Sequence, residues 1–438
     1  MSRPVGGTEH SWCRAVPGGT GVTVSAILLS KPPNLPHLQS LIHQLQSHHP
    51  ILRSKLHFNP TTNTFSFSDQ TSGSTPPTLQ IHTSDHTHSF YQTLEQEMNT
   101  NPWNNQEITE TDVMFASLYN LPNEQWAVVL RLHTAVCDRV AATGLMRELV
   151  GLMGGGEMGV AKEEGLGVAI EDCVPAGKAN KPFWARGADM IGYSVNAFRF
   201  SNLEFAETGL PDSTRFVRLK IGVDETDKIV NGCKAKGVKL FGALAAAGFI
   251  AARASKSLPD EKWEKYSLAT LIDCRSELDP VISDHHVGFY HSAILNSHDI
   301  KGGEDLWDLA QKIYTSLTTA KNKNKHFTDM ADLNFLMCKA IENPGLTPSS
   351  SLRTSLISVF EEPVTENANQ IHQEIGLLDY VGCASVHGVS PSLAIFDSIR
   401  DGELDCACVY PSPTHSREQM QDLVDHMKKI LVECSVPQ

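Results

Sequence analysis

The stretch "LRLHTAVCDRVAATGLMREL" (130–149) contains the change from strand to helix that decides the fold. Its first residues are apolar and strand-like, and "AATGLMREL" (141–149) carries apolar residues at helical spacing. His133 and Asp138 lie at the junction. The end of a strand holds an imidazole ring in place. An aspartate just before a helix holds the loop around that ring, so the pair is a candidate for general acid–base chemistry. Context must decide, because a chain with 19 histidines produces such a spacing by chance.

Composition excludes several classes of protein. The chain has 438 residues, 41% hydrophobic and 20% charged, which is enough for two domains or two halves of one large unit. Its formal net charge of -14 argues against nucleic acid or an anionic membrane as the main partner. No apolar run reaches the roughly 18 residues of a membrane helix, and none resembles a secretion signal, so we expect a cytoplasmic protein. The ten cysteines lack metal-site spacing, so neither a metal nor a disulfide is expected.

The residues before the opening stretch predict strands and one helix. The pattern gives a β-rich segment (19–30), a helix running into a strand (35–58), an exposed hairpin or loop (59–80) and two strands (113–121 and 126–133). The linking "PNEQ" predicts that the last two strands form a hairpin that leads into the opening stretch, whose helix is expected over 139–153.

The second half also alternates helices with strands. The expected helices are 188–200, 224–236, 238–255, 304–322 and 416–433, and the expected strands are 214–221, 266–280, 286–295, 353–360 and a hairpin over 391–410. No short internal repeat is present, which excludes solenoids and propellers. We therefore predict an α/β protein with an N-terminal half (1–185), a Gly- and Pro-rich crossover linker (about 154–187) and a C-terminal half (186–438).

The order of these segments resembles the chloramphenicol-acetyltransferase-like superfamily, which includes plant BAHD acyltransferases, fungal alcohol acetyltransferases and condensation domains of peptide synthetases. The resemblance covers essentially the whole chain. It rests on four segments besides the opening stretch: "HHPILRSKL" (48–56), "DCRSEL" (273–278), "RTSLISVF" (353–360) and "LDYVG" (378–382), which looks like a decayed DFGWG motif. The resemblance implies two similar α/β halves, each a mixed sheet flanked by helices, with an active tunnel at their interface.

The family motif is HHxxxDG, in which the second histidine is the base, and the ungapped match here is "HTAVCDR" (133–139). In this register Thr134 occupies the position of the base, and a threonine hydroxyl is a poor proton acceptor at pH 7. If the strand continues, residues 133 and 134 point to opposite faces, so His133 replaces the base only if a bulge rotates it. Otherwise another histidine serves, with His291 the better candidate and His387 the poorer. His133 then has a structural role.

The resemblance assigns supporting roles to further residues. Asp138 is expected to pair with Arg275 and lock the motif loop, the alternative being two unrelated surface charges. Thr354 and Ser355 resemble the hydroxyl residues that stabilise the tetrahedral oxyanion, although both could be ordinary strand residues.

An acyl-CoA co-substrate would require a phosphate site. Lys236, Lys239 and Phe241 lie at the start of the apolar helix, where the resemblance places the CoA channel and where helix N–H groups favour phosphate. The alternative is a solvated lysine cluster. "KNKNK" (321–325) is interpreted as a plain loop.

Three functions remain open. The first is an acyl-CoA-dependent O- or N-acyltransferase of specialised metabolism, a monomer acting on a small-molecule acceptor. The second is a lyase or cyclase on the same scaffold that uses no CoA, which Thr134 and Arg139 favour. The third is a non-catalytic binding protein.

Overall fold

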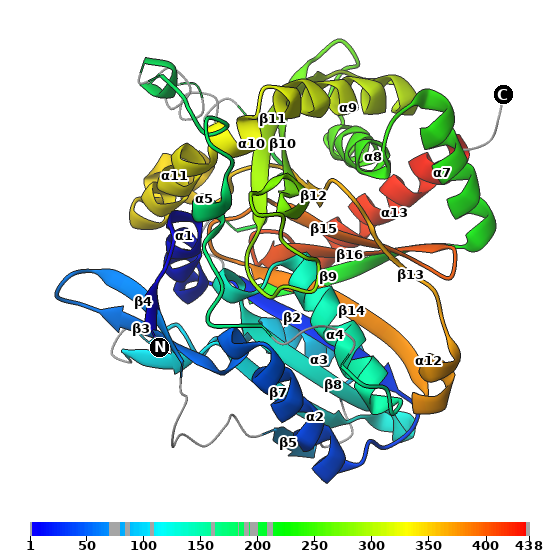
Figure 1. Cartoon of the computed structure of the whole chain (residues 1–438). Coiled ribbons are helices and arrows are strands. Elements are labelled where there is room, and N and C mark those ends of the chain that lie inside the picture. Colours follow the sequence, from blue (N-terminus) through cyan, green and yellow to red (C-terminus); the bar gives the residue numbers. More distant parts are fainter. Residues whose placement is uncertain are drawn as a thin grey trace. The chain divides into compact units, whose positions relative to one another are not determined.

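A computed structural model of the chain describes residues 2–69, 79–83, 88–105, 109–158, 163–182, 184–187, 192, 200–207 and 213–434. The chain forms two compact units (Figure 1). The first unit consists of Met1–Val174, Cys274–Tyr290 and Ala368–Ser385, and the second of Pro175–Asp273, His291–Asn367 and Val386–Gln438.

The first unit is built on a five-stranded sheet in the order β14-β2-β8-β7-β5. Its strands are β2 (Thr20–Leu29), β5 (Gln80–Thr83), β7 (Met114–Asn120), β8 (Trp126–His133) and β14 (Leu377–Val386). β8 pairs antiparallel with both β2 and β7, and every residue after Trp126 is buried. The run "AVVLRL" accounts for this position, because a strand covered on both faces needs mostly apolar residues. Its one charged residue, Arg131, pairs with the buried Glu97.

Helices cover this sheet and share a core with it. They are α1 (Gly7–Ala15), α2 (Leu35–His48), α3 (Phe90–Asn99), α4 (Arg139–Met153), α5 (Ile170–Cys173) and α12 (Gln370–Ile375). Leu38, Leu41 and Leu45 of α2 join Leu145 and Leu149 of α4 in one buried apolar cluster. The helical spacing that the sequence shows in both segments therefore marks the faces that pack inward.

A second, four-stranded sheet of the first unit has the order β1-β4-β3-β6. Its strands are β1 (Ser2–Pro4), β3 (Ser54–Asn59), β4 (Thr64–Asp69) and β6 (Glu110–Asp112). β3 and β4 form the hairpin expected after residue 58, and residues 70–78 lie outside the described part.

The second unit contains a seven-stranded sheet in the order β11-β10-β12-β15-β16-β9, with β13 paired to β15 off this path. Its strands are β9 (Ser213–Ile221), β10 (Glu264–Asp273), β11 (His291–Ile300), β12 (Ile357–Phe360), β13 (Val364–Glu366), β15 (Leu393–Arg400) and β16 (Glu403–Ser412). Parallel β10-β12-β15 pairs and antiparallel pairs on either side make this a mixed sheet.

Helices of the second unit pack against this sheet (Figure 1). They are α7 (Val223–Lys236), α8 (Leu240–Ala254), α9 (Leu306–Asn322), α10 (Lys325–Thr328), α11 (Met330–Glu342) and α13 (Arg417–Cys434). α8 is buried along nearly its whole length. It lies so close to β12 that a Cβ atom at Gly248 would stand 2.4 Å from Ile357 Cδ1.

The α/β fold class expected from the sequence is confirmed, but two expected strands begin later than predicted. The strand expected over 353–360 begins only at Ile357. The strand expected over 286–295 begins only at His291. Residues 274–290 leave the second unit's sheet and belong to the first unit. The helix expected over 188–200 falls almost entirely outside the described residues.

The division into units differs from the expected halves, 1–185 and 186–438. The boundary lies between Val174 and Pro175, and two later segments, Cys274–Tyr290 and Ala368–Ser385, return to the first unit. β14 joins its sheet beside β2, and Arg275 pairs with Asp138. A strand pairing between such distant residues cannot be deduced from composition along the chain.

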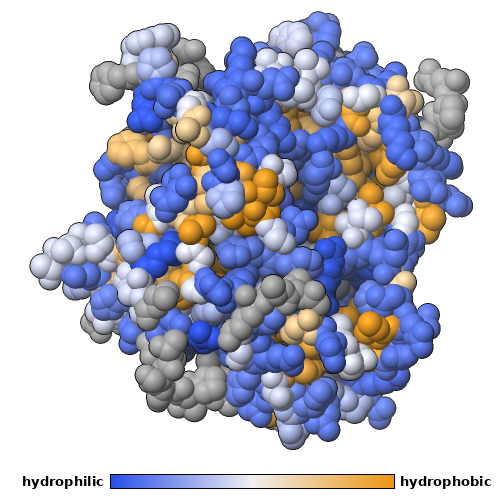
Figure 2. All heavy atoms as spheres, in the orientation of Figure 1, coloured by the Kyte–Doolittle hydropathy of each residue, from blue (hydrophilic) through white to orange (hydrophobic). Residues whose placement is uncertain are grey.

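Polar residues dominate the face drawn in Figure 2, and apolar side chains form only small patches on it. No single helix among the described residues is long and apolar enough to cross a membrane. α7 and α8 meet the length and composition only together, as a pair bent by 104°.

Replacement of Gly248 tests the close approach of α8 to β12. Gly248→Ala should lower the free energy of unfolding by about 1–3 kcal/mol, because the added methyl group overlaps the buried Ile357. Urea denaturation measures this. Gly151→Ala is the matched control, since Gly151 lies in α4 with open space at its Cβ position and should gain up to about 1 kcal/mol of helix propensity. Equal effects of the two substitutions would contradict the packing.

Candidate functional site

The motif lies at the end of β8, where the chain makes a single turn of 3-10 helix (Thr134–Val136) before α4 begins. His133 is the last strand residue and Asp138 is the N-cap of α4. β8 pairs with β2 in unbroken register from Trp126 to His133. The strand therefore contains no bulge up to His133.

His133 is completely buried, and its ring stands edge-on to Trp103 at 5.1 Å between centroids. Its Nδ1 accepts a hydrogen bond from the backbone N–H of Ala135 at 3.1 Å. The proton of the neutral ring is therefore assigned to Nε2, which has no hydrogen-bond partner among the described residues. Burial lowers the pKa of His133 to about 3. One ring nitrogen thus carries the proton and the lone pair of the other is engaged, an arrangement that suits a structural role for His133.

Thr134 forms a structural hydrogen bond where the family has its base. Its buried hydroxyl donates to the carbonyl oxygen of Gly21 at 2.6 Å and lies 2.7 Å from the hydroxyl of Thr23. Gly21 has a φ of +95°, and a Cβ atom there would lie 3.0 Å from Trp12 and 3.1 Å from Thr134 Oγ1. Glycine is required at this position, and Thr134 fixes it to the end of β8.

Asp138 accepts hydrogen bonds from three parts of the first unit. Oδ1 accepts the N–H of Ala141 at 2.9 Å and so caps α4. Arg275 donates from Nη1 to Oδ2 at 2.8 Å and from Nη2 to Oδ1 at 3.0 Å, and the N–H of Tyr290 donates to Oδ2 at 2.8 Å. The expected pair therefore forms, completely buried, and it binds the returning segment 274–290 to the motif.

A cluster of acidic residues and histidine lies in the same unit and was not anticipated from the sequence. The buried His49, just after α2, contacts Glu163 through Nδ1 at 2.9 Å and Glu148 of α4 through Nε2 at 2.8 Å. Burial alone would lower the pKa of His49, but the two carboxylates raise it to about 9. Glu163 also accepts the N–H of Val287 at 2.8 Å, so the cluster holds the returning segment as well.

The remaining predicted base candidates lie in the second unit. His291 opens β11 opposite Asp273, is buried, and has its ring edge-on to Phe360 at 5.8 Å between centroids. His387 contacts the hydroxyl of Thr214 through Nδ1 at 2.9 Å. Both belong to the second unit and the motif belongs to the first, and the tunnel expected between the halves stays a prediction.

Thr354 and Ser355 precede β12 rather than lie within it. Thr354 is exposed and donates its backbone N–H to the carbonyl oxygen of Ser390 at 2.9 Å. Ser355 is buried, and its hydroxyl has no hydrogen-bond partner among the described residues. Ser355 is therefore a buried hydroxyl donor, whereas the hydroxyl of Thr354 lies on an exposed residue.

Arg353, next to these residues, was missed by the sequence reasoning. It is 1% exposed and donates to the carbonyl oxygens of Ser351, Val386, Gly388 and Pro391 and to the hydroxyl of Ser390. Burial lowers its pKa to about 9. An arginine before an apolar run is the only signal in the sequence, and it does not reveal that carbonyl groups will enclose the side chain. Arg353 fixes the position of Thr354 and Ser355.

The geometry does not support the phosphate role expected at the start of α8. Lys236 is exposed at the end of α7, whereas Lys239 contacts Glu361 at 2.7 Å and Glu362 at 2.5 Å. Burial alone would lower the pKa of Lys239, but hydrogen bonds to these two carboxylates raise it. Phe241 is a core residue whose ring packs near Tyr314. The charge of Lys239 is therefore neutralised within the protein. In the described part of the chain no three His, Cys, Asp or Glu side chains are arranged to hold a metal ion.

Comparison with solved structures identifies the fold. No family model and no curated protein sequence matches the chain. A trichothecene 15-O-acetyltransferase, TRI3 from Fusarium sporotrichioides, superposes with a TM-score of 0.73 at 12% identity, over 99% of this chain and 95% of that one. The chain has the chloramphenicol-acetyltransferase-like fold.

Two further structures agree with this assignment. Polyketide synthase associated protein 5 from Mycobacterium tuberculosis has a TM-score of 0.68 at 16% identity, over 99% of this chain and 98% of that one. The first condensation domain of the calcium-dependent antibiotic synthetase has a TM-score of 0.68 at 13% identity, over 99% and 97%. Each match spans nearly the whole length of both chains, so the resemblance seen in the order of sequence segments is confirmed for the fold.

Removal of the Asp138 charge should destabilise the first unit strongly. Asp138→Asn leaves the guanidinium of Arg275 buried without a carboxylate, which should cost about 3–5 kcal/mol in urea denaturation. Glu433→Gln is the control, because its pair with Lys429 is exposed and should be worth less than about 1 kcal/mol. A loss in Asp138→Asn no larger than in the control would show that the buried pair does not hold the motif.

The raised pKa of His49 predicts that the stability of the protein depends on pH. Its pKa is higher in the folded protein than the unfolded value of 6.5, so its contribution is complete below pH 6.5 and disappears as the pH rises through about 9. The difference in unfolding free energy between wild type and His49→Gln should shrink across this window, by up to about 3 kcal/mol. His37→Gln, at an exposed site on α2, is the control and should show no such trend. A constant difference for His49→Gln would refute the charged state of His49.

Proposed function

We propose that the protein is an acyltransferase that moves an acyl group from a thioester, most simply acyl-CoA, to the amine of a small molecule. Its fold is shared with an acetyltransferase and with a condensation domain. The observation that carries the choice of acceptor is the state of the motif: His133 is neutral, with its Nδ1 engaged, and Thr134 donates its hydroxyl to Gly21.

The acceptor follows from the proton balance of the reaction. An alcohol is a poor nucleophile until a base removes its proton, which is the task of the family's second histidine. A neutral amine attacks a thioester carbonyl with its own lone pair. The C–N bond forms, the C–S bond breaks, and the proton released from nitrogen ends on the thiolate or on water. An amine acceptor therefore needs positioning more than a base.

The free hydroxyl of Ser355 fits the same mechanism as a donor to the developing oxyanion. It is buried, and Arg353 fixes the backbone that carries it. A donor aimed at the oxyanion typically contributes a factor of about 10² to 10³ in turnover.

A second candidate is a lyase or cyclase that uses the scaffold without CoA. The same replacement of the base by Thr134, locked onto Gly21, favours it. In that case a bound substrate would fragment or cyclise without release of any thiol. The non-catalytic binding protein is the remaining alternative, and it predicts stabilisation by a ligand without turnover.

The deciding experiment measures thiol release from a panel of acyl-CoAs, each offered with an amine and with the alcohol of the same carbon skeleton. Thiol release should require the amine. His133→Gln should lower turnover by less than about tenfold, whereas loss of a true base costs about 10²- to 10⁴-fold. Circular dichroism checks that the variant is folded.

Two results would overturn this assignment. Equal or faster reaction with alcohols, together with a hundredfold loss in His291→Gln, would mean that His291 is a base after all. If no acyl-CoA releases thiol with any amine, the lyase and the binding protein remain. Turnover of a candidate substrate without CoA would then distinguish the lyase from the binding protein.

A further inference from the structure

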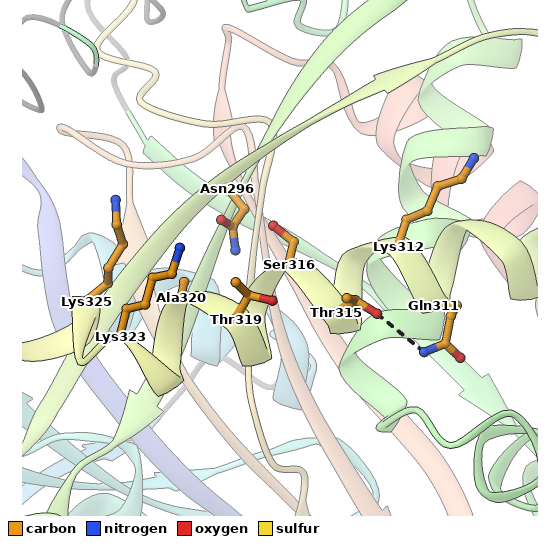
Figure 3. Close-up of a pocket in the computed structure, with 9 residues that line it drawn as sticks. All are labelled: Asn296, Gln311, Lys312, Thr315, Ser316, Thr319, Ala320, Lys323 and Lys325. Atoms are coloured by element: carbon orange, nitrogen blue, oxygen red, sulfur yellow. Dashed lines mark hydrogen bonds between the residues drawn. The ribbon is translucent and has the colours of Figure 1, made fainter.

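A groove runs along α9 on the second unit, beside β11 and α10. Its volume is about 600 Å³, within the range of about 300–1,000 Å³ that is typical of small-molecule sites. The lining residues are mostly lysines, hydroxyl residues and amides: Asn296, Gln311, Lys312, Thr315, Ser316, Thr319, Ala320, Lys323 and Lys325 (Figure 3). Two of the lysines come from "KNKNK", which the sequence reasoning took for a plain loop.

Hydrogen-bond donors are concentrated at one end of this groove. Figure 3 shows Asn296 of β11 facing Ser316 and Thr319 of α9, with Lys323 and Lys325 beside them. In the described part of the chain no hydrogen bond or ion pair involves the side chains of Asn296, Ser316, Thr319 or Lys323. Each can donate a hydrogen bond, and Lys323 adds a positive charge.

The neighbouring charges do not cancel this site. Lys325 approaches Asp329 at 3.6 Å, but Asp329 already binds the buried Lys181 at 2.7 Å. At the other end of the groove Lys312 pairs with Glu304 at 3.2 Å. The positive charge of Lys323 therefore remains beside the neutral donors, on a protein whose net charge is -14.

Lys323 is the C-cap of α9, and the negative end of the helix dipole favours a cation there. The dipole therefore explains this lysine but not the rest of the arrangement. It gives no reason for Asn296, which comes from a different element, to present its amide beside Ser316 and Thr319. Several neutral donors around one or two ammonium groups suit the oxygen atoms of a phosphoryl group.

We propose that this groove binds a phosphorylated small molecule, with a phosphoryl group between Lys323, Lys325 and Asn296. The rest of the ligand extends along α9 toward Gln311 and Lys312. Lys312 and Lys323 are separated by 11 residues, three turns of helix, which corresponds to about 16 Å. A nucleotide-sized molecule spans that length and inorganic phosphate does not. This proposal does not rest on the proposed acyl transfer, because none of the lining residues belongs to the motif.

Isothermal titration of the full chain with inorganic pyrophosphate tests the phosphoryl end. Binding should be saturable, and Lys323→Glu and Asn296→Leu should each weaken it at least tenfold. Lys234→Glu is the matched control, because Lys234 is an exposed lysine near the end of α7, outside the groove, and changes the net charge equally. It should alter the affinity by less than twofold at constant ionic strength.

Titration with citrate, which like pyrophosphate carries about three negative charges near pH 7.5, separates a phosphoryl site from a general attraction for anions, and citrate should bind at least tenfold more weakly than pyrophosphate. The proposal is wrong if pyrophosphate binding is not saturable, if Lys323→Glu and Lys234→Glu weaken it alike, or if citrate binds as well. Loss of acyl transfer in the earlier assay would leave these results unaffected.

Discussion

The buried contact between Asp138 and Arg275 joins two parts of the first unit that lie 137 residues apart in sequence. One carboxylate caps α4, receives two hydrogen bonds from Arg275 and accepts the N–H of Tyr290. Two charges taken out of water are favourable only when their hydrogen bonds are satisfied and well aligned. The segment 274–290 must therefore return to the first unit, and β11 must begin where that segment ends.

The contact with Arg275 gives Asp138 a structural role in the motif that is separate from any role in proton transfer. Asp138 makes the contacts that lock the loop. His133 is buried against Trp103 with its Nδ1 engaged, and Thr134, the first residue of the 3-10 turn, binds Gly21. The loop is therefore held by interactions that do not depend on proton transfer.

Buried charges elsewhere in the chain are also held by several partners at once. His49 lies between two glutamates that connect α2, α4 and the returning segment. Arg353 is enclosed by carbonyl groups and fixes the backbone at Thr354 and Ser355. Removing one partner from such a group leaves a charge without compensation, so these residues resist substitution for structural reasons. Their positions next to candidate site residues do not make them catalytic.

The sequence by itself determined the local elements and the fold class. Apolar periodicity located β8, α4 and α8, and the order of segments indicated the chloramphenicol-acetyltransferase-like fold, because both depend on neighbouring residues along the chain. The departure of Thr134 from the motif was also visible in the letters. The tertiary structure alone decided that β14 and the segment 274–290 belong to the first unit, and that His133 is buried with its Nδ1 engaged. It also showed that Lys239 is neutralised by Glu361 and Glu362 while Lys323 is not. Charge and protonation depend on burial and on partners far along the chain, and spacing in the sequence contains no information about either.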